Sequence, residues 1–173
     1  MLNTLKLIKL FLNTKYQNDA GRFLIENNKT LSIAESCTGG LLSSLMTDVS
    51  GSSAYIKCNF VTYANEAKMQ YLGVKKQTLE NYGAVSLQTA EEMVKGLLER
   101  TGCDYALATT GIAGPTGGTE EKPVGLVYIG IGTKDKFHVF KYNTNPNYPR
   151  LLIKYIFANQ ALKLFSKFIT EKD

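Results

Sequence analysis

The sequence has few of the residues from which metal sites and disulfide frameworks are built. Among its 173 residues are one histidine, His138, and three cysteines, at positions 37, 58 and 103. No Cys-x-x-Cys pair occurs and the number of cysteines is odd, so a disulfide framework is not expected and a reducing, cytoplasmic compartment is favoured. A catalytic metal needs several ligands at short spacing, which one histidine and scattered cysteines do not provide. We therefore expect no metal site.

Long apolar runs and long runs of one charge are also missing from the sequence. No apolar stretch reaches 18 residues, so no transmembrane helix is expected. The formal net charge is +5, from 20 Lys and Arg against 15 Asp and Glu. A basic excess can serve nucleic-acid binding, but there is no run of five like charges and no basic stripe with interleaved aromatic residues. A lysine-rich solvated surface is the favoured interpretation, with no nucleic-acid partner and no membrane partner.

The first 14 residues are interpreted as an N-terminal amphipathic extension. Leu5, Ile8 and Leu12 share one helical face, and Lys9 interrupts what would otherwise resemble the apolar core of a signal peptide. We expect residues 1–14 to form a helix that packs on the domain or on a partner subunit, in preference to a helix that lies on a membrane surface.

Residues 15–173 are predicted to form one domain of the α/β class. Predicted helices and strands alternate through the first two thirds, and a hairpin and a long helix follow, which favours a single three-layer α/β/α domain with a mixed sheet. The expected strands are residues 30–35, 55–63, 105–110, 124–132 and 137–142. One expected helix ends near residues 27–28, and the others occupy 41–49, 65–72, 77–82, 87–100 and 148–169, the last with an apolar face of Ile153, Ile156, Phe157, Gln160, Leu164 and Phe168.

Three polar clusters follow predicted strands, and the first is Glu-Ser-Cys-Thr-Gly-Gly at residues 35–40. A strand there leads through glycines into a helix, and backbone N–H groups at the start of such a helix can bind an anion or an oxyanion. Ser36 and Thr38 supply hydroxyl groups. Cys37 is a rival nucleophile, although no histidine lies near it in the sequence to activate its thiolate. The alternative interpretation is a Ser/Thr capping turn without a catalytic role.

The second cluster contains Tyr63, Asn65 and Lys68. On a helix, Asn65 and Lys68 are three residues apart and share a face. A lysine held among apolar groups can lose its proton and act as a base toward a serine. The alternative, which this cluster alone would favour, is an exposed lysine paired with Glu66 or another carboxylate.

The third cluster is a glycine-rich loop at residues 109–118. Its residue types permit a close approach of the backbone to a ligand, but no Gly-Lys-Ser/Thr follows, so it is not a Walker phosphate-binding loop. The alternative is a wide connection between two strands. His138 lies in a predicted alternating strand and is expected to be structural, which disfavours a Ser-His-Asp triad and favours a lysine base.

In their order and spacing these clusters resemble the CinA C-terminal domain family over about residues 18–168. The matching segments are Ala-Glu-Ser-Cys-Thr-Gly-Gly at 34–40, Gly-Ser-Ser-Ala at 51–54, Val-Thr-Tyr-Ala-Asn-Glu-Ala-Lys at 61–68, Gly-Ala-Val-Ser at 83–86, Thr-Gly-Ile-Ala-Gly-Pro at 110–115 and Glu-Lys-Pro-Val-Gly at 121–125. Studied members of that family are nicotinamide-nucleotide amidases. The resemblance implies an α/β/α fold, a homo-oligomer with a dimer favoured, and conversion of nicotinamide mononucleotide to nicotinic acid mononucleotide and ammonia without a metal or a cofactor.

The resemblance also implies which residues form the site. The family's serine matches Ser36 and its lysine matches Lys68, with Tyr63 beside it. Two alternatives stay open, namely that Thr38 attacks or that Ser36 only orients a water. The predicted substrate-binding residues are Thr38, Gly39, Gly40, Asn65, Thr110, Gly111, Gly114, Arg150 and Lys154.

One departure from the family pattern concerns the basic pair before the last helix. Family members often carry two arginines there, whereas this sequence has Arg150 and then Lys154. A lysine lacks the bidentate fork with which arginine grips phosphate. The alternative function is therefore a non-catalytic nucleotide-binding or protein-interaction domain built on the same scaffold.

Overall fold

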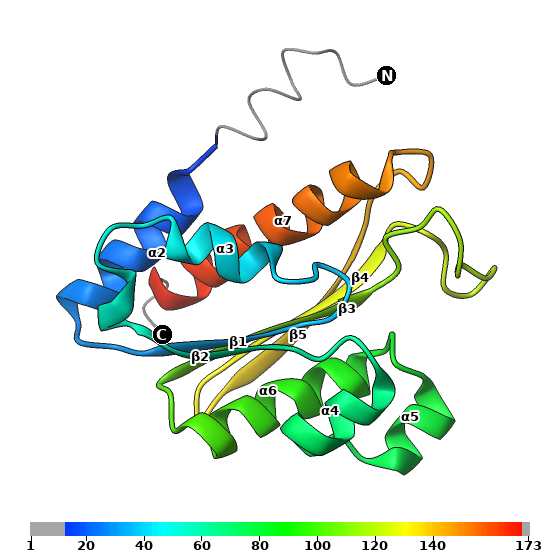
Figure 1. The fold of residues 1–173 in the computed structure, drawn as a ribbon, viewed down its shortest axis with the longest axis horizontal. Coiled ribbons are helices and arrows are strands. Elements are labelled where there is room, and N and C mark those ends of the chain that lie inside the picture. The colour runs from blue at the N-terminus through cyan, green and yellow to red at the C-terminus, as the bar shows by residue number, and fades with distance from the viewer. Residues whose placement is uncertain (1–12, 171–173) are drawn as a thin grey trace.

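The computed structural model describes residues 13–170 and arranges them in three layers (Figure 1). The helices are α2 (Lys15–Glu26), α3 (Leu41–Thr47), α4 (Asn65–Leu72), α5 (Lys76–Tyr82), α6 (Leu87–Thr101) and α7 (Arg150–Thr170), with a short 3₁₀ helix η1 (Ser52–Ala54). The strands are β1 (Leu31–Glu35), β2 (Ile56–Val61), β3 (Tyr105–Gly111), β4 (Leu126–Gly132) and β5 (Phe137–Asn143). All but two residues of the predicted N-terminal extension lie outside the described residues.

The strands form one mixed sheet in the order β2-β1-β3-β4-β5. Strand β1 is parallel to both β2 and β3, whereas β4 is antiparallel to β3 and to β5. Helices α2, α3 and α7 cover one face of the sheet, and α4, α5 and α6 lie on the other (Figure 1). The predicted α/β class with a mixed sheet is confirmed.

Helices on both faces give the central strands no solvent-facing side. All five residues of β1 are buried, including the polar Ser32 and Glu35. This burial is typical of parallel strands that are covered on both sides. Two hydrophobic clusters result, one around Phe157 and Phe165 under α7 and the other around Met93 under α6.

The buried face of α7 differs from the predicted one. Ile153 and Phe157 are buried, but the other four predicted residues are only half-buried: Ile156, Gln160, Leu164 and Phe168. Helix α7 packs against α2 and α3 as well as the sheet, so its core face is broader and is turned toward Leu162 and Phe165.

Within residues 13–170, no helix combines the length and hydrophobicity needed to cross a bilayer.

Strand β4 begins two residues later than predicted because a glycine turn precedes it. Gly125 has a φ of +92°, in the left-handed region that glycine adopts without strain. Its N–H donates to the carbonyl oxygen of Ile112 at 2.8 Å, which closes the base of the glycine-rich loop. Val124 therefore belongs to the loop and not to the strand.

Helices α4 and α6 approach each other with their backbones in contact. A Cβ built on Gly96 of α6 would overlap the carbonyl oxygen of Leu72, the last residue of α4. Only a glycine permits this approach. Because α4 also carries Lys68, one turn before Leu72, the packing at Gly96 sets where Lys68 lies relative to the sheet.

Candidate functional site

Most of the polar residues predicted from the sequence gather where β1 and β3 end. Glu35 of β1 lies opposite Thr109 of β3, and the N–H of Ser36 donates to the carbonyl oxygen of Thr109 at 3.0 Å. Ligands of open α/β sheets bind at the carboxyl ends of the strands, where the loops after them meet. A cavity of about 260 Å³ opens at this edge, and its lining includes Ser36, Tyr63, Lys68, Thr110, Gly111, Gly114 and Arg150.

Two backbone carbonyl groups hold the amine of Lys68 beside Ser36. Its Nζ lies 2.8 Å from the carbonyl oxygen of Thr62, 3.2 Å from that of Tyr63 and 3.1 Å from Oγ of Ser36. A neutral amine keeps two N–H bonds and one lone pair. When both carbonyl oxygens accept a hydrogen, the lone pair is left to face the Ser36 hydroxyl.

Burial disfavours the protonated form of Lys68. The residue is only 1% exposed, and desolvation lowers its pKa from the ordinary value of 10.5. The negative charge of Glu66 acts in the opposite direction but does not cancel this effect. The interpretation of Lys68 as an exposed surface lysine is therefore wrong. Ser36, by contrast, is half-buried and lines the cavity, so a hydroxyl open to a ligand is adjacent to a buried amine.

A buried carboxylate that the sequence analysis did not single out fixes the turn after Ser36. Oε2 of Glu35 accepts hydrogen bonds from the N–H groups of Gly40 and Leu42, both at 3.0 Å. Oε1 accepts from the N–H and the hydroxyl of Ser43, at 2.8 and 2.6 Å. These are the donors that the start of α3 leaves without helical partners. The available signal was an acidic residue directly before a glycine turn that leads into a helix.

The sequence predicts that backbone N–H groups of Thr38, Gly39 or Gly40 face an oxyanion, and those of Gly39 and Gly40 are already used inside the turn. The N–H of Gly40 donates to the carboxylate just described, and that of Gly39 donates to the carbonyl oxygen of Ser36 at 3.2 Å. The expectation that these two groups face an oxyanion is therefore wrong, because the helix start binds the protein's own carboxylate. In the described part of the chain, the N–H groups of Cys37 and Thr38 donate to no backbone carbonyl oxygen and are the donors of this turn that are left.

Both rival nucleophiles of the turn are buried. Cys37 is 5% exposed, and burial raises the pKa of its thiol to about 12, so little thiolate exists at neutral pH. Thr38 is fully buried, and its Oγ1 shares a 2.8 Å hydrogen bond with Oγ1 of Thr109. Thr38 does not line the cavity. The geometry of this turn favours Ser36 as the attacking group.

Arg150 connects Tyr63 to the glycine-rich loop. Its Nη2 donates to the hydroxyl of Tyr63 at 2.8 Å, and its Nη1 donates to the carbonyl oxygen of Gly114 at 2.6 Å. Lys154, one turn further along α7, has its Nζ 3.3 Å from the position that a Cβ on Gly39 would take. Helix α7 thus brings one cation to each of the two loops that border the site.

The remaining predicted binding residues differ in their positions. Thr110 and Gly111 line the cavity, and the hydroxyl of Thr110 donates to the carbonyl oxygen of Ala84 at 2.6 Å. Asn65 is exposed at the first position of α4 and does not line the cavity, although Lys68 of the same helix does. The structure therefore does not bring Asn65 to the site.

His138 lies at the opposite end of the sheet from Ser36. It pairs with Ile131 near the end of β4, and its ring contacts Phe140 and Phe168. This position rules out a triad with Ser36. Through residues 13–170, no group of three or more His, Cys, Asp and Glu side chains is placed to hold a metal ion.

Comparisons with known proteins agree with the fold and the order of motifs. A model of the family described as CinA C-terminal domain matches residues 13–169. The chain is 56% identical over 133 residues to a CinA-like protein of Endomicrobium trichonymphae, which covers 77% of this chain and 31% of that protein. It is 57% identical over 114 residues to a putative competence-damage inducible protein of Clostridium novyi, a match that covers 66% of this chain and 28% of that protein. The chain thus spans about a third of the length of the curated relatives it matches.

Solved structures of similar proteins extend over nearly the whole chain. The competence damage-inducible protein A of Klebsiella pneumoniae superposes with a TM-score of 0.87 at 28% identity, covering 92% of this chain and 98% of that one. The competence/damage inducible protein CihA of Agrobacterium tumefaciens gives a TM-score of 0.83 at 37% identity, covering 90% and 96%.

Proposed function

The chain belongs to the CinA C-terminal domain family, and from that premise we propose that the Ser36 site hydrolyses the carboxamide of nicotinamide mononucleotide to give nicotinic acid mononucleotide and ammonia. The names of the relatives state no such reaction, so the proposal rests on the resemblance and on the chemistry that the site permits. One observation carries it, namely the buried amine of Lys68 placed 3.1 Å from the Ser36 hydroxyl.

The first half of the proposed reaction transfers the acyl group to Ser36. Neutral Lys68 accepts the hydroxyl proton while Oγ of Ser36 attacks the carboxamide carbon, which forms a tetrahedral intermediate. Lys68 then gives the proton to the departing nitrogen, and ammonia leaves an ester on Ser36. The N–H of Cys37, a residue that lines the cavity, supplies a donor for the oxyanion.

The second half restores the enzyme. Lys68 takes a proton from water as the water attacks the ester carbon. The intermediate collapses, the proton passes from Lys68 to Oγ of Ser36, and the carboxylic acid is released. Each turnover consumes one water and releases one ammonia, so no external oxidant, reductant or metal is needed for the balance.

The basic groups beside the cavity suit a substrate that carries a phosphate. The cavity of about 260 Å³ is smaller than sites that enclose a drug-sized ligand, which are about 300–1,000 Å³. It therefore encloses the ring and its carboxamide and leaves the ribose phosphate at the rim. Arg150 stands at that rim, and Lys154 adds a second positive charge beside Gly39.

An ammonia-release assay tests the proposal. Nicotinamide mononucleotide is the substrate, free nicotinamide and glutamine are the comparison amides, and each reaction is run with and without a chelator. We expect release from the nucleotide, much weaker release from the other amides, no effect of the chelator, and no release by Ser36→Ala. If the folded protein released ammonia from none of these amides, the non-catalytic nucleotide-binding function would be favoured instead.

A further inference from the structure

Two segments that carry neither Ser36 nor Lys68 supply much of the lining of the Ser36 cavity. One is the turn between α5 and α6, which contributes Ala84 and Val85. The other is the glycine-rich loop between β3 and β4, which contributes residues 111–114, 116 and 117. The shape of the space that receives a ligand therefore depends on how this turn and this loop are held relative to each other.

The middle of the glycine-rich loop is exposed to solvent. Residues 115–121 are all exposed, and the loop extends past the end of the sheet (Figure 1). The N–H of Gly125 closes its base, and Arg150 holds the carbonyl oxygen of Gly114. An exposed segment with little packing keeps a single position only where specific contacts tie it to the body of the domain. The part of the loop after Gly117 needs such a contact of its own.

Lys122 provides this contact by reaching from the loop to the end of α5. Its Nζ donates to the carbonyl oxygen of Tyr82, the last residue of α5, at 2.5 Å. The same nitrogen lies 3.1 Å from the position that a Cβ on Gly83 would take, so a side chain there would crowd it. The backbone of Lys122 is held as well, because its N–H donates to Oγ1 of Thr119 at 3.0 Å and its carbonyl oxygen accepts from the N–H of Thr119 at 2.9 Å. One half-buried amine thus connects two segments that are 40 residues apart in the sequence.

The turn that Lys122 holds continues directly into the cavity lining. Three successive carbonyl groups of this turn accept hydrogen bonds from side chains. That of Tyr82 accepts from Lys122, and that of Gly83 accepts from two hydroxyl groups at the start of α6, at 3.0 and 2.8 Å. The carbonyl oxygen of Ala84 accepts from the hydroxyl of Thr110 at 2.6 Å. A displacement at Tyr82 is therefore passed along the turn to Ala84, which lines the cavity.

We propose that Lys122 is a positioning residue of the Ser36 site, which fixes the part of the cavity that receives the substrate ring. Its hydrogen bond to Tyr82 keeps the loop and the turn in one relative position, so the lining that they supply has one shape. Without this bond the cavity has its binding shape in only a fraction of the molecules, and the apparent affinity falls by that fraction. Lys122 lies outside the lining itself, so its loss leaves proton transfer between Ser36 and Lys68 in place. The role rests on the proposed amidase function.

Steady-state ammonia release from nicotinamide mononucleotide tests this role. Lys122→Met should raise KM by about tenfold and change kcat by less than about twofold, the pattern of lost ground-state binding. Lys122→Arg keeps the charge and a donor, and a single carbonyl oxygen does not require the geometry of an ammonium group, so it should restore most of the wild-type KM. Lys134→Met is the matched control, because it removes an exposed lysine from the β4–β5 turn at the opposite end of the sheet, and it should change neither constant.

Backbone order parameters from NMR relaxation measure the tie itself, without any substrate. In Lys122→Met the order parameters of residues 116–121 should fall from about 0.85, the value of rigid backbone, toward about 0.6, the value of flexible backbone. The amide resonances of residues 84 and 85 should shift, whereas those of β1 should not. Lys122→Ser truncates the side chain and stays polar, and it should behave like Lys122→Met, so the test does not depend on the folding of one variant.

The results that overturn this role differ from those that overturn the proposed function. An active wild type with an unchanged KM in Lys122→Met, or with a loss of kcat as large as the rise in KM, would contradict the positioning role alone. So would wild-type order parameters at residues 116–121 in Lys122→Met, or a Lys122→Arg variant as impaired as Lys122→Met. A folded wild type that releases no ammonia from the nucleotide would overturn the amidase function and this role with it, even where the order parameters of the variant fall.

Discussion

The two ends of the sheet carry cavities that differ in how their polar groups are held. At the carboxyl ends of β1 and β3, Lys68 is tied to Ser36 and to two backbone carbonyl groups, and Arg150 is tied to Tyr63 and the glycine-rich loop. At the other end, aromatic rings meet edge-on around a larger space, and charged side chains stand at its border. Reactive chemistry depends on a few buried polar groups in fixed positions, whereas volume indicates only that a ligand has room.

The largest expected effect separates the two ends by activity. Ser36→Ala and Lys68→Ala should each lower kcat for ammonia release by about 10³-fold or more, and the double variant should lose little further, because residues that act as one unit are not additive. His138→Ala, at the opposite end, should leave kcat unchanged. An equal loss of kcat in His138→Ala would show that activity does not reside at the Ser36 end alone. Losses that multiply in the double variant would contradict the paired mechanism.

The pH dependence of activity should follow Lys68. Its neutral form is the base and burial lowers its pKa, so kcat/KM should rise with pH to a plateau reached below pH 10.5. Below the folded-state pKa the rate should fall by about tenfold per pH unit. At a pH between the lowered pKa of folded Lys68 and its ordinary pKa of 10.5 in the unfolded chain, the unfolded chain binds a proton that the folded chain does not. The free energy of unfolding therefore rises with pH through that window.

A pH–rate profile and urea unfolding at several pH values measure both effects. Lys68→Met is the reference for stability, because it cannot titrate and should flatten the pH dependence within the window. A rate that rises only at the pKa of ordinary lysine, or a Lys68→Met variant with an unchanged stability profile, would contradict the assignment.

A smaller effect is expected from the carboxylate that orders the turn after Ser36. Glu35→Gln places an amide N–H against backbone donors, so it should lower the free energy of unfolding by about 1–3 kcal/mol. Asp48→Asn, at the exposed end of the same helix α3, should stay within about 0.5 kcal/mol of the wild type. Urea unfolding measures both, and equal stabilities of the two variants would mean that the Glu35 charge does not order the turn.

The smallest expected effect concerns the cations of α7. Arg150→Ala together with Lys154→Ala should raise KM for the nucleotide by about tenfold and lower kcat less, the pattern of lost ground-state binding. Steady-state kinetics measure this split, and Lys163→Ala is the control, because it removes one exposed positive charge elsewhere on the same helix. An unchanged KM would remove both residues from the site.

Local signals explain why most elements could be predicted from the sequence. Helix α4 has the predicted bounds because its helix formers end at Gly73, which adopts a φ of +69°. Helix α6 begins as predicted because the hydroxyl of Ser86 accepts the N–H of Thr89 at 3.1 Å. The order of motifs, through the family resemblance, predicted the pairing of Ser36 with Lys68 that the structure brings together.

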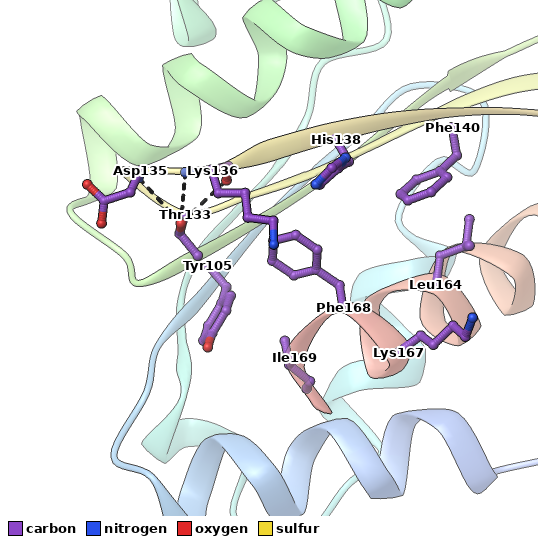
Figure 2. A pocket seen from close by; sticks show the side chains of 10 residues that line it. All are labelled: Tyr105, Thr133, Asp135, Lys136, His138, Phe140, Leu164, Lys167, Phe168 and Ile169. Carbon is purple, nitrogen blue, oxygen red and sulfur yellow. Dashed lines mark hydrogen bonds between the residues drawn. The ribbon is translucent and has the colours of Figure 1, made fainter. Parts of the chain in front are cut away.

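Features that depend on tertiary packing could not be predicted in the same way. The side chain of Glu35 reaches donors five to eight residues ahead, which is further than a capping box spans. An acidic residue before a glycine turn is the local signal, but it does not specify these partners. The broad face of α7 depends on which helices pack beside it. The larger cavity at the opposite end of the sheet (Figure 2) is lined by Tyr105, His138 and Phe168. These residues span more than 60 positions of the sequence and meet only through the sheet order.

The close approach at Gly96 has a consequence for how freely the chain tolerates substitution. Alanine in a helix interior normally stabilises by about 1 kcal/mol over glycine, so an engineer guided by helix propensity would choose Gly96 early. Here an added methyl group would meet the carbonyl oxygen of Leu72 and displace α4, and Lys68 with it. A survey of all substitutions should therefore find this position as intolerant as Ser36, although it lies outside the lining of the cavity and takes no part in the chemistry.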